Sequence, residues 1–190
     1  MKTALYAAAI ALTATGAAAA PEAYTLDPSH SQVVFHYDHL GFSETYNMFA
    51  GWEGEIMFDA EDPAASSVDV SVPVRSLYTG WEERFEHIMG PDFFDAQDGD
   101  LITFKSTSIE VTDDDEAIIT GDLTMNGVTK SVQLETELNK HGQHPMEGKD
   151  WLGFEAETKI KRSEFGLDQF VPNISDELDV QISIEAGKAG

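Results

Sequence analysis

The sequence contains no cysteine and few basic residues. Without cysteine there is no disulfide framework, no thiol nucleophile and no lipid attached to an N-terminal cysteine. Lysine and arginine together number 11 against 35 acidic residues, which gives a formal net charge of −24. Such a chain repels nucleic acid and anionic lipid head groups. Because the acids are scattered, we interpret them as a solvated acidic shell rather than a face for a basic partner.

The first 20 residues, MKTALYAAAIALTATGAAAA, differ from the rest of the chain. They carry one positive charge at Lys2, then a small and apolar run without any acid, then a tract of alanines. This is the plan of a secretory signal peptide, and the run is too short and alanine-rich to span a bilayer. We expect cleavage near Ala19 or Ala20 and export to the periplasm, with an uncleaved anchor as the alternative. Residues 21–190 contain no linker or repeat and predict one domain.

The mature sequence alternates apolar and polar residues with the period of a half-buried strand. Asn126-Gly127 is typical of a two-residue hairpin turn, in which both residues need positive φ. The alternation slips near Ser108 and Ile109, which predicts a β-bulge, and Pro73 indicates an edge, an end or a bulge. Eight segments show the pattern: 31–39, 52–58, 68–74, 102–109, 121–125, 128–138, 152–160 and 178–184.

These eight segments predict an all-β fold. Their outward faces are too charged to be covered by a second layer, so the apolar faces must share one interior. Closure into a barrel also removes the exposed edges of an open sheet. We therefore predict an eight-stranded antiparallel barrel, whose interior is either filled by side chains or holds one small ligand.

One segment, TGWEERFEHIMGPDFFD at residues 79–95, breaks the alternation. Thr79 and Glu82 have the spacing of a capping box, and Gly90-Pro91 is a stop signal. The segment therefore predicts one short helix. Its apolar residues recur at helical spacing: Trp81, Phe85 and Ile88.

Arg84 and His87 lie three residues apart on this helix, so their side chains are neighbours. They could meet the polar group of a ligand, or act as substrate clamp and general base of an enzyme. An arginine that bonds a nearby acid and a histidine that caps the helix end are the structural alternative.

The sequence predicts neither a metal site nor a catalytic residue. His30 and His36 would lie on one strand face, too far apart to share an ion. His141 and His144 form an HxxH in a segment with glycine and proline, and the acidic run at 113–116 lacks the glycine of a calcium loop. There is no G-x-S-x-G elbow, and no pair of carboxylates stands out.

Seven blocks of the chain, in this order, match a known family. Through these blocks the chain resembles, over residues 24–186, the YceI-like family of periplasmic lipid-binding proteins, which are also called polyisoprenoid-binding proteins. The resemblance implies a lipocalin-like barrel with the helix near its mouth, often dimeric, and an apolar tunnel that holds a long isoprenoid or fatty chain without catalysis. The blocks are DPSHSQVVF at 27–35, DHLGFSE at 38–44, S-x-x-T-G-x-x-x-R-x-x-H at 76–87, PDFFD at 91–95, ITFKST at 102–107, GDLTMNGVTKSV at 121–132 and KRSEFGLD at 161–168.

The chain departs from the family's usual pattern at four positions. Phe85 stands where an aspartate commonly follows the helix arginine, which removes a partner for Arg84 or His87 and makes the mouth more apolar. The preference for a head group is therefore open, whereas binding of the tail is unaffected. The other three departures are Ile88 for leucine, Asn126 for histidine and Lys161 for asparagine.

Pattern and resemblance together predict an exported carrier or store of one long-chain apolar molecule, such as ubiquinone or a polyprenyl lipid, with no catalytic cofactor. Arg84 and His87 are expected to form a polar rim at the tunnel mouth. We expect a homodimer, transient membrane contact and no nucleic-acid partner. A lipid-modifying enzyme using Arg84 and His87 and a binder whose tunnel is closed by its own aromatics are the alternatives. The expected tunnel lining is Phe35, Tyr37, Trp52, Ile56, Phe58, Trp81, Phe85, Phe94, Phe104, Leu123, Met125 and Phe154.

Overall fold

The computed structural model describes residues 20–190, so residues 1–19 of the predicted signal peptide lie outside the described part. Among the described residues, no helix is both long and apolar enough to cross a membrane. The elements in chain order are β1 (Glu22–Leu26), β2 (Gln32–His39), β3 (Ser43–Ala50), β4 (Glu53–Phe58), η1 (Pro63–Ala65), β5 (Ser67–Pro73), η2 (Val74–Ser76), β6 (Leu77–Tyr78), α1 (Glu82–Met89), β7 (Leu101–Val111), β8 (Glu116–Met125), β9 (Val128–Gln143), β10 (Asp150–Lys161), η3 (Arg162–Phe165) and β11 (Glu177–Lys188).

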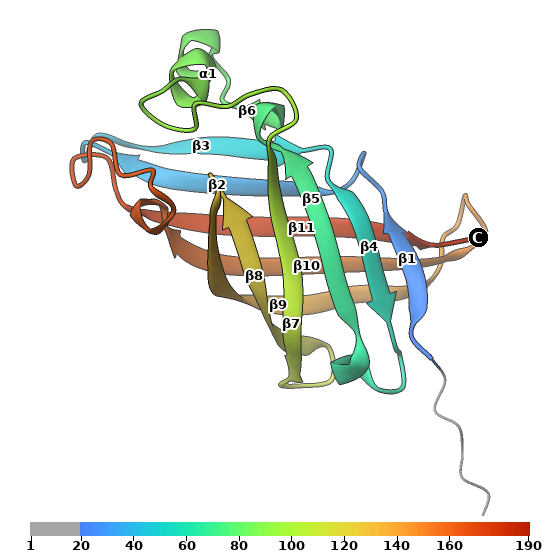
Figure 1. Ribbon diagram of the computed structural model, residues 1–190. Helices are drawn as coiled ribbons and strands as arrows, with labels where there is room; N and C mark the ends of the chain where they lie inside the picture. The colour runs from blue at the N-terminus through green and yellow to red at the C-terminus, as the bar shows by residue number, and fades with distance from the viewer. Residues whose placement is uncertain (1–19) are drawn as a thin grey trace, which may run out of the picture.

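The strands close into an antiparallel barrel (Figure 1). Neighbouring strands follow the order β1-β4-β5-β7-β8-β9-β10-β11, and β11 pairs back with β1. This circuit has eight strands and confirms the predicted eight-stranded antiparallel barrel. The sequence pattern missed β1, β3 and β6, because β1 and β6 are short and β3 (SETYNMFA) shows little apolar alternation.

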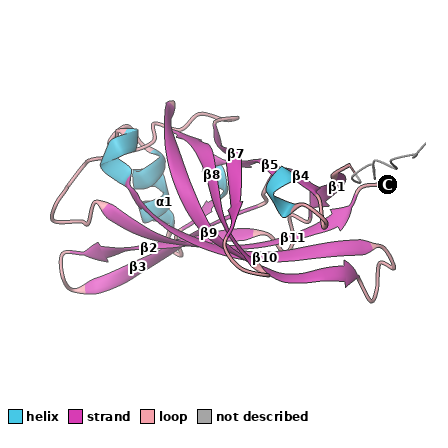
Figure 2. Ribbon diagram, turned by 90° about the horizontal axis from the view of Figure 1, so that it is seen from below, coloured by secondary structure: helices cyan, strands magenta, loops and turns pink. Residues whose placement is uncertain are grey.

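Strands β2, β3 and β6 continue the sheet beyond the circuit, next to β11. β2 prolongs β1 after a short break, β3 leads into β4, and β6 follows β5. β11 pairs with β2 through 179–183 and with β1 through 186–188. Figure 2 shows β2 and β3 reaching out on the side where α1 lies. These three strands therefore extend the barrel at one end as an open part of the same sheet.

Polar groups of the chain fill the break between β1 and β2. The Ser31 hydroxyl donates to the Glu185 carbonyl oxygen at 3.2 Å and accepts from the Glu185 N–H at 3.3 Å. The Asp27 N–H also donates to the Glu185 carbonyl oxygen, at 2.8 Å. Because these bonds satisfy the backbone of β11 opposite the break, β11 crosses from β2 to β1 without losing its partners.

Three local predictions of turn and strand geometry are confirmed. Asn126 and Gly127 have φ values of 51° and 71°, as the two-residue hairpin requires. The register between β7 and β8 shifts between Ser106 and Ser108, where the alternation slips. Pro73 is the last residue of β5.

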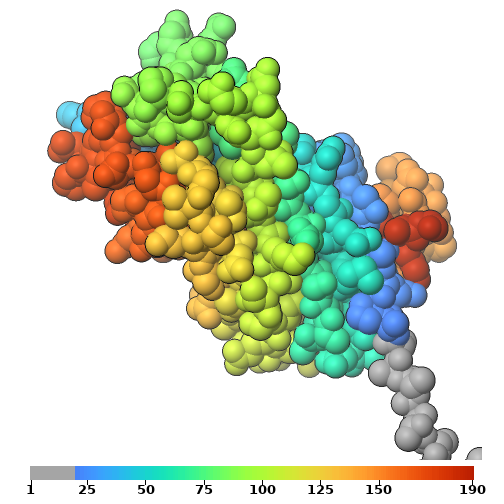
Figure 3. All heavy atoms as spheres, in the orientation of Figure 1, coloured from blue at the N-terminus to red at the C-terminus, as the bar shows by residue number. Residues whose placement is uncertain are grey.

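The helix starts later than its sequence signals predict. The N-cap residue of α1 is Trp81, and it makes no side-chain capping bond, so the predicted capping box at Thr79 is wrong. The Thr79 hydroxyl instead donates to the carbonyl oxygen of Trp81 at 2.7 Å and stabilises the turn before the helix. The predicted stop is correct, since Gly90 is the C-cap. In Figure 1 the α1 segment lies above β3, and in the space-filling view of Figure 3 the same segment, in light green, protrudes at the top of the molecule.

We predict that the glycine at position 54 is important for the stability of the fold, because β4 and β5 approach each other closely at Gly54. Gly54 has φ +143°, and a β-carbon there would lie 2.3 Å from the carbonyl oxygen of Asp69 and 2.7 Å from the Val70 α-carbon. Gly54→Ala should therefore lower the free energy of unfolding by about 3 kcal/mol, measured by urea denaturation.

Gly153→Ala is the matched control, because Gly153 also lies in a strand but has no atom within 4 Å of the added carbon. It should change stability by less than about 0.5 kcal/mol. Equal losses in the two variants would show that close strand packing at Gly54 is not the cause.

Candidate functional site

The barrel contains a cavity of about 500 Å³ with a mainly apolar wall. Along each barrel strand every second residue faces it, because side chains of a strand alternate between its two faces. On β9 these residues are Val132, Leu134, Thr136 and Leu138, and on β11 they are Leu178, Val180, Ile182 and Ile184. The aromatic side chains of the wall thus leave part of the interior unfilled.

Most of the predicted lining residues lie in this wall. They come from β2, from the β3–β4 junction and from β4, β7, β8 and β10, together with the segment after α1. Contact of these residues with a ligand stays a prediction. They are Phe35, Tyr37, Trp52, Ile56, Phe58, Phe94, Phe104, Leu123, Met125 and Phe154.

Trp81 and Phe85 are not among the residues that line the cavity. Trp81 is 61% exposed because it precedes the first turn of α1 instead of lying within the helix. Phe85 packs against the core cluster, with the guanidinium of Arg75 5.5 Å from its ring centre. The helix segment contributes Ile88, Phe93 and Phe94 to the wall instead.

Arg84 and His87 have local partners and are not part of the cavity wall as described. Arg84 Nη1 donates to the carbonyl oxygen of Thr79 at 3.0 Å. His87 Nε2 lies 3.4 Å from a carboxylate oxygen of Asp92, and its ring meets Phe93 edge to face at 5.2 Å. Phe93 does line the cavity, so His87 is separated from it by one side chain. The polar-rim role of Arg84 and His87 stays a prediction.

A polar cluster around the buried Tyr24 lies near the start of β10 and includes one residue of the cavity wall, His141. The Tyr24 hydroxyl donates to Asp150 Oδ2 at 2.9 Å, and His141 Nε2 lies 2.8 Å from the same oxygen. Burial and the neighbouring Asp150 carboxylate raise the pKa of Tyr24 well above its ordinary value, so the hydroxyl stays a neutral donor. The sequence did not reveal this cluster, because β1 was not predicted.

Arg162 is a buried cation that lines the cavity near the other end of β10. Its guanidinium donates to four backbone carbonyl oxygens: Ser175 at 2.9 Å, Gln169 at 3.0 Å, Ile174 at 2.9 Å, and Leu167. Burial lowers the pKa of this arginine, while the negative charge of Asp176 opposes the shift. Arg162 thus holds the segment after η3 in place against the barrel.

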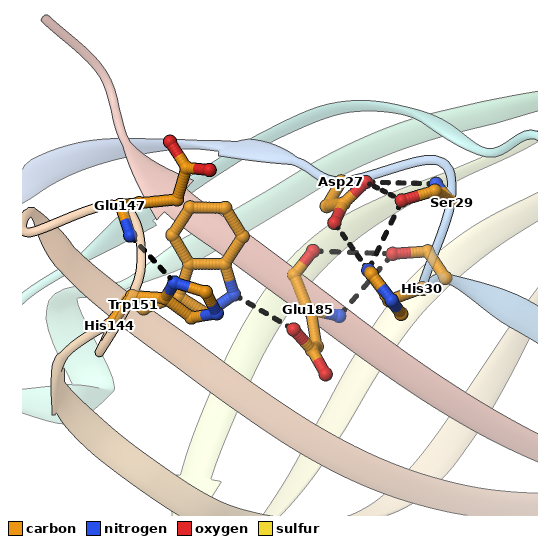
Figure 4. Close-up of polar contacts among 8 residues, drawn as sticks. Asp27, Ser29, His30, His144, Glu147, Trp151 and Glu185 are labelled. Atoms are coloured by element: carbon orange, nitrogen blue, oxygen red, sulfur yellow. Dashed lines mark hydrogen bonds and ion pairs between the residues drawn. The ribbon is translucent and has the colours of Figure 1, made fainter.

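Three potential metal ligands, Asp27, His30 and Glu185, meet at the β1–β2 break (Figure 4). Their ligand atoms lie within 4.8 Å of one another. However, His30 Nδ1 is 2.7 Å from Asp27 Oδ2, the Ser29 hydroxyl donates to Asp27 Oδ1 at 2.6 Å, and Glu185 Oε2 accepts from the indole N–H of Trp151 at 3.0 Å. We interpret the group as a polar clamp across the break. The sequence pattern did not predict that Glu185 lies near His30, because β11 is far from these residues in the chain.

Comparisons with known proteins agree with this architecture. The profile of the YceI-like domain matches residues 24–186. The protein YceI of Escherichia coli O157:H7 is 40% identical over 178 residues, which cover 94% of this chain and 92% of that protein. The crystal structure of a Campylobacter jejuni YceI protein superposes with a TM-score of 0.71 at 29% identity, covering 80% of this chain and 90% of that one. A polyisoprenoid binding domain from Saccharophagus degradans shares the fold, with a TM-score of 0.69 at 14% identity and coverage of 88% and 99%.

We predict that the Asp27–His30 pair stabilises the fold only in a limited pH range. Hydrogen bonds from His30 and Ser29 lower the pKa of Asp27 from 3.8 to about 2, so its contribution is lost as the pH falls through this range. The Asp27 carboxylate raises the pKa of His30 above 6.5, so that contribution is complete below pH 6.5 and is lost as the pH rises through the raised value. The difference in melting temperature between the parent and His30→Gln should therefore be largest near pH 5.

Melting curves at intervals from about pH 2 to about pH 9, recorded by circular dichroism, test this prediction across both limits of the window in which the pair is charged. A difference that stays constant across this range would show that the pair contributes no charge-dependent stability.

Proposed function

The chain belongs to the YceI-like family, and from this premise we propose that it carries or stores one long-chain apolar molecule, such as an isoprenoid quinone or a polyprenyl lipid. The observation that carries the proposal is the cavity of about 500 Å³ with its mainly apolar wall. Each buried methylene group contributes about 0.8 kcal/mol, so a chain enclosed there gains ample affinity before ordering costs. The proposal extends to this chain the ligand class named for the Saccharophagus domain of the same fold.

Family and fold point to a binding protein rather than an enzyme. Two polar residues of the cavity wall support this view, because their bonds are made within the protein. His141 pairs with Asp150, and Arg162 donates to four carbonyl oxygens of the segment after η3. These bonds stabilise the two ends of the barrel. Binding of a ligand's tail requires only the apolar wall between the ends.

Export and membrane contact are further parts of the proposal. The composition of residues 1–20 supports export to the periplasm through a cleaved signal peptide. Phe42, at the β2–β3 turn, is 88% exposed, and Tyr78 and Trp81 are also exposed near α1. Aromatic side chains of this kind suit the surface of a lipid bilayer, where a ligand could be exchanged. The homodimer implied by the family stays a prediction.

The proposal predicts that the protein purified gently from its native compartment contains one apolar chain molecule per protomer or per dimer. Native mass spectrometry followed by organic extraction would identify it. Removal of the ligand should lower the melting temperature, because a ligand that binds only the folded state stabilises it. If nothing apolar is recovered and the protein also fails to take up added quinones and prenyl alcohols, the proposal is wrong.

A second prediction places the binding site inside the barrel. Leu134 lines the cavity in the middle of β9, and Leu134→Trp adds bulk that displaces part of the chain. Affinity for a long prenyl alcohol should fall about tenfold, since two lost methylene contacts have this effect. Gln133→Trp is the control, because Gln133 is the exposed neighbour on the same strand. Equal affinities in both variants would place the binding site elsewhere.

A further inference from the structure

The break between β1 and β2 brings three metal-ligating side chains together from two distant parts of the chain (Figure 4). Asp27 follows β1 directly, and His30 lies within the break. Glu185 belongs to β11, between the residues that pair with β2 and those that pair with β1. A carboxylate oxygen of each acid and a ring nitrogen of His30 all lie within 4.8 Å of one another. The three side chains therefore face one common space.

The spacing of these three atoms is close to that of the ligands of a bound ion. Zinc binds histidine nitrogen and carboxylate oxygen at about 2.1 Å, which places neighbouring ligands of a tetrahedral ion about 3.4 Å apart. The three atoms must therefore approach one another by no more than about 1.4 Å. His30 has room for such a shift, because its side chain is 64% exposed.

Both carboxylates are held in place by donors that are not themselves among the three ligands. The N–H and the hydroxyl of Ser29 donate to Asp27 Oδ1 at 2.9 and 2.6 Å. The indole N–H of Trp151 donates to Glu185 Oε2 at 3.0 Å. Trp151 packs against Gly187, where a β-carbon would lie 2.4 Å from its ring, so only glycine leaves space for the indole. Outer hydrogen bonds of this kind orient the carboxylates of metal sites.

Only one hydrogen bond of the polar clamp joins two of the three side chains. It is the contact between His30 Nδ1 and Asp27 Oδ2 at 2.7 Å. A cation would replace the hydrogen atom of this contact, whereas the bonds from Ser29 and Trp151 to the carboxylates would remain. The polar clamp is therefore compatible with a bound ion.

We propose that Asp27, His30 and Glu185 bind one divalent transition-metal ion, such as Zn²⁺, which ties the β1–β2 break to β11. The imidazole nitrogen favours a transition metal over Mg²⁺ and Ca²⁺, because those two ions prefer oxygen ligands. The two carboxylates balance the double charge of the ion, and water completes its coordination. None of the three residues lines the cavity, so this site is separate from the proposed lipid-binding function.

Isothermal titration calorimetry of the untagged, chelator-treated protein tests the site directly. We expect the uptake of one Zn²⁺ per chain. The melting temperature should rise with the concentration of Zn²⁺, because an ion that binds only the folded state stabilises it. Mg²⁺ at the same concentrations should produce neither effect.

Glu185→Gln separates metal binding from the polar clamp. It removes a charged ligand, while the amide oxygen can still accept from the indole N–H of Trp151. The affinity for Zn²⁺ should fall by more than about tenfold, since even the outer partners of a metal ligand contribute this much. Glu157→Gln is the matched control, because it makes the same change of charge at an exposed position of β10. It should leave the affinity for Zn²⁺ as in the parent.

Trp151→Phe tests the orientation of Glu185. It should weaken Zn²⁺ binding about ten- to hundredfold, because Glu185 loses the donor that holds its carboxylate. The circular dichroism spectrum of the same sample separates this effect from unfolding.

Three results would overturn the inference. Absence of Zn²⁺ uptake by the folded parent protein would exclude the site. Equal affinities for Zn²⁺ in the parent, His30→Gln and Glu185→Gln would place the ion elsewhere, for example at His141 and Asp150. An equal rise of the melting temperature with Mg²⁺ would show that divalent cations only screen the acidic surface. Uptake of an apolar chain by the same protein tests the proposed function independently.

Discussion

The pairing of β1 with β11 is the contact on which the rest of the structure depends. Every strand of the barrel is apolar on one face and polar or acidic on the other, so a single sheet can bury its apolar faces only by closing on itself. Tyr24 and Leu26 of β1 lie opposite Lys188 and Ala186 of β11. Without this short ladder the apolar wall of the cavity would open to water along a whole strand.

The same closure explains why the interior is a cavity and not a packed core. An eight-stranded barrel has a fixed width, and side chains either fill it or leave room for one ligand. Small residues at inward positions, such as Ala156, Thr136 and Thr158, leave that room. β10, with 12 residues, spans about 40 Å along its own axis.

Polar groups lie near both ends of this long wall. Near one end of β10, Tyr24 and His141 share the Asp150 carboxylate, and at the other end Arg162 binds backbone carbonyl oxygens. These groups are satisfied within the protein and so stabilise the ends of the barrel.

Local periodicity and turn chemistry by themselves determined eight of the strands, their inward faces, the hairpin at Asn126-Gly127 and the bulge in β7, because these features depend on residues close in the chain. The resemblance of seven sequence blocks indicated the family. The tertiary structure alone decided that Trp81 faces solvent, and that Arg162 binds carbonyl oxygens of the segment after η3. The contact between Tyr24 and Asp150 was also decided by the tertiary structure. Such contacts depend on which strands become neighbours when the barrel closes, and no local sequence pattern encodes that.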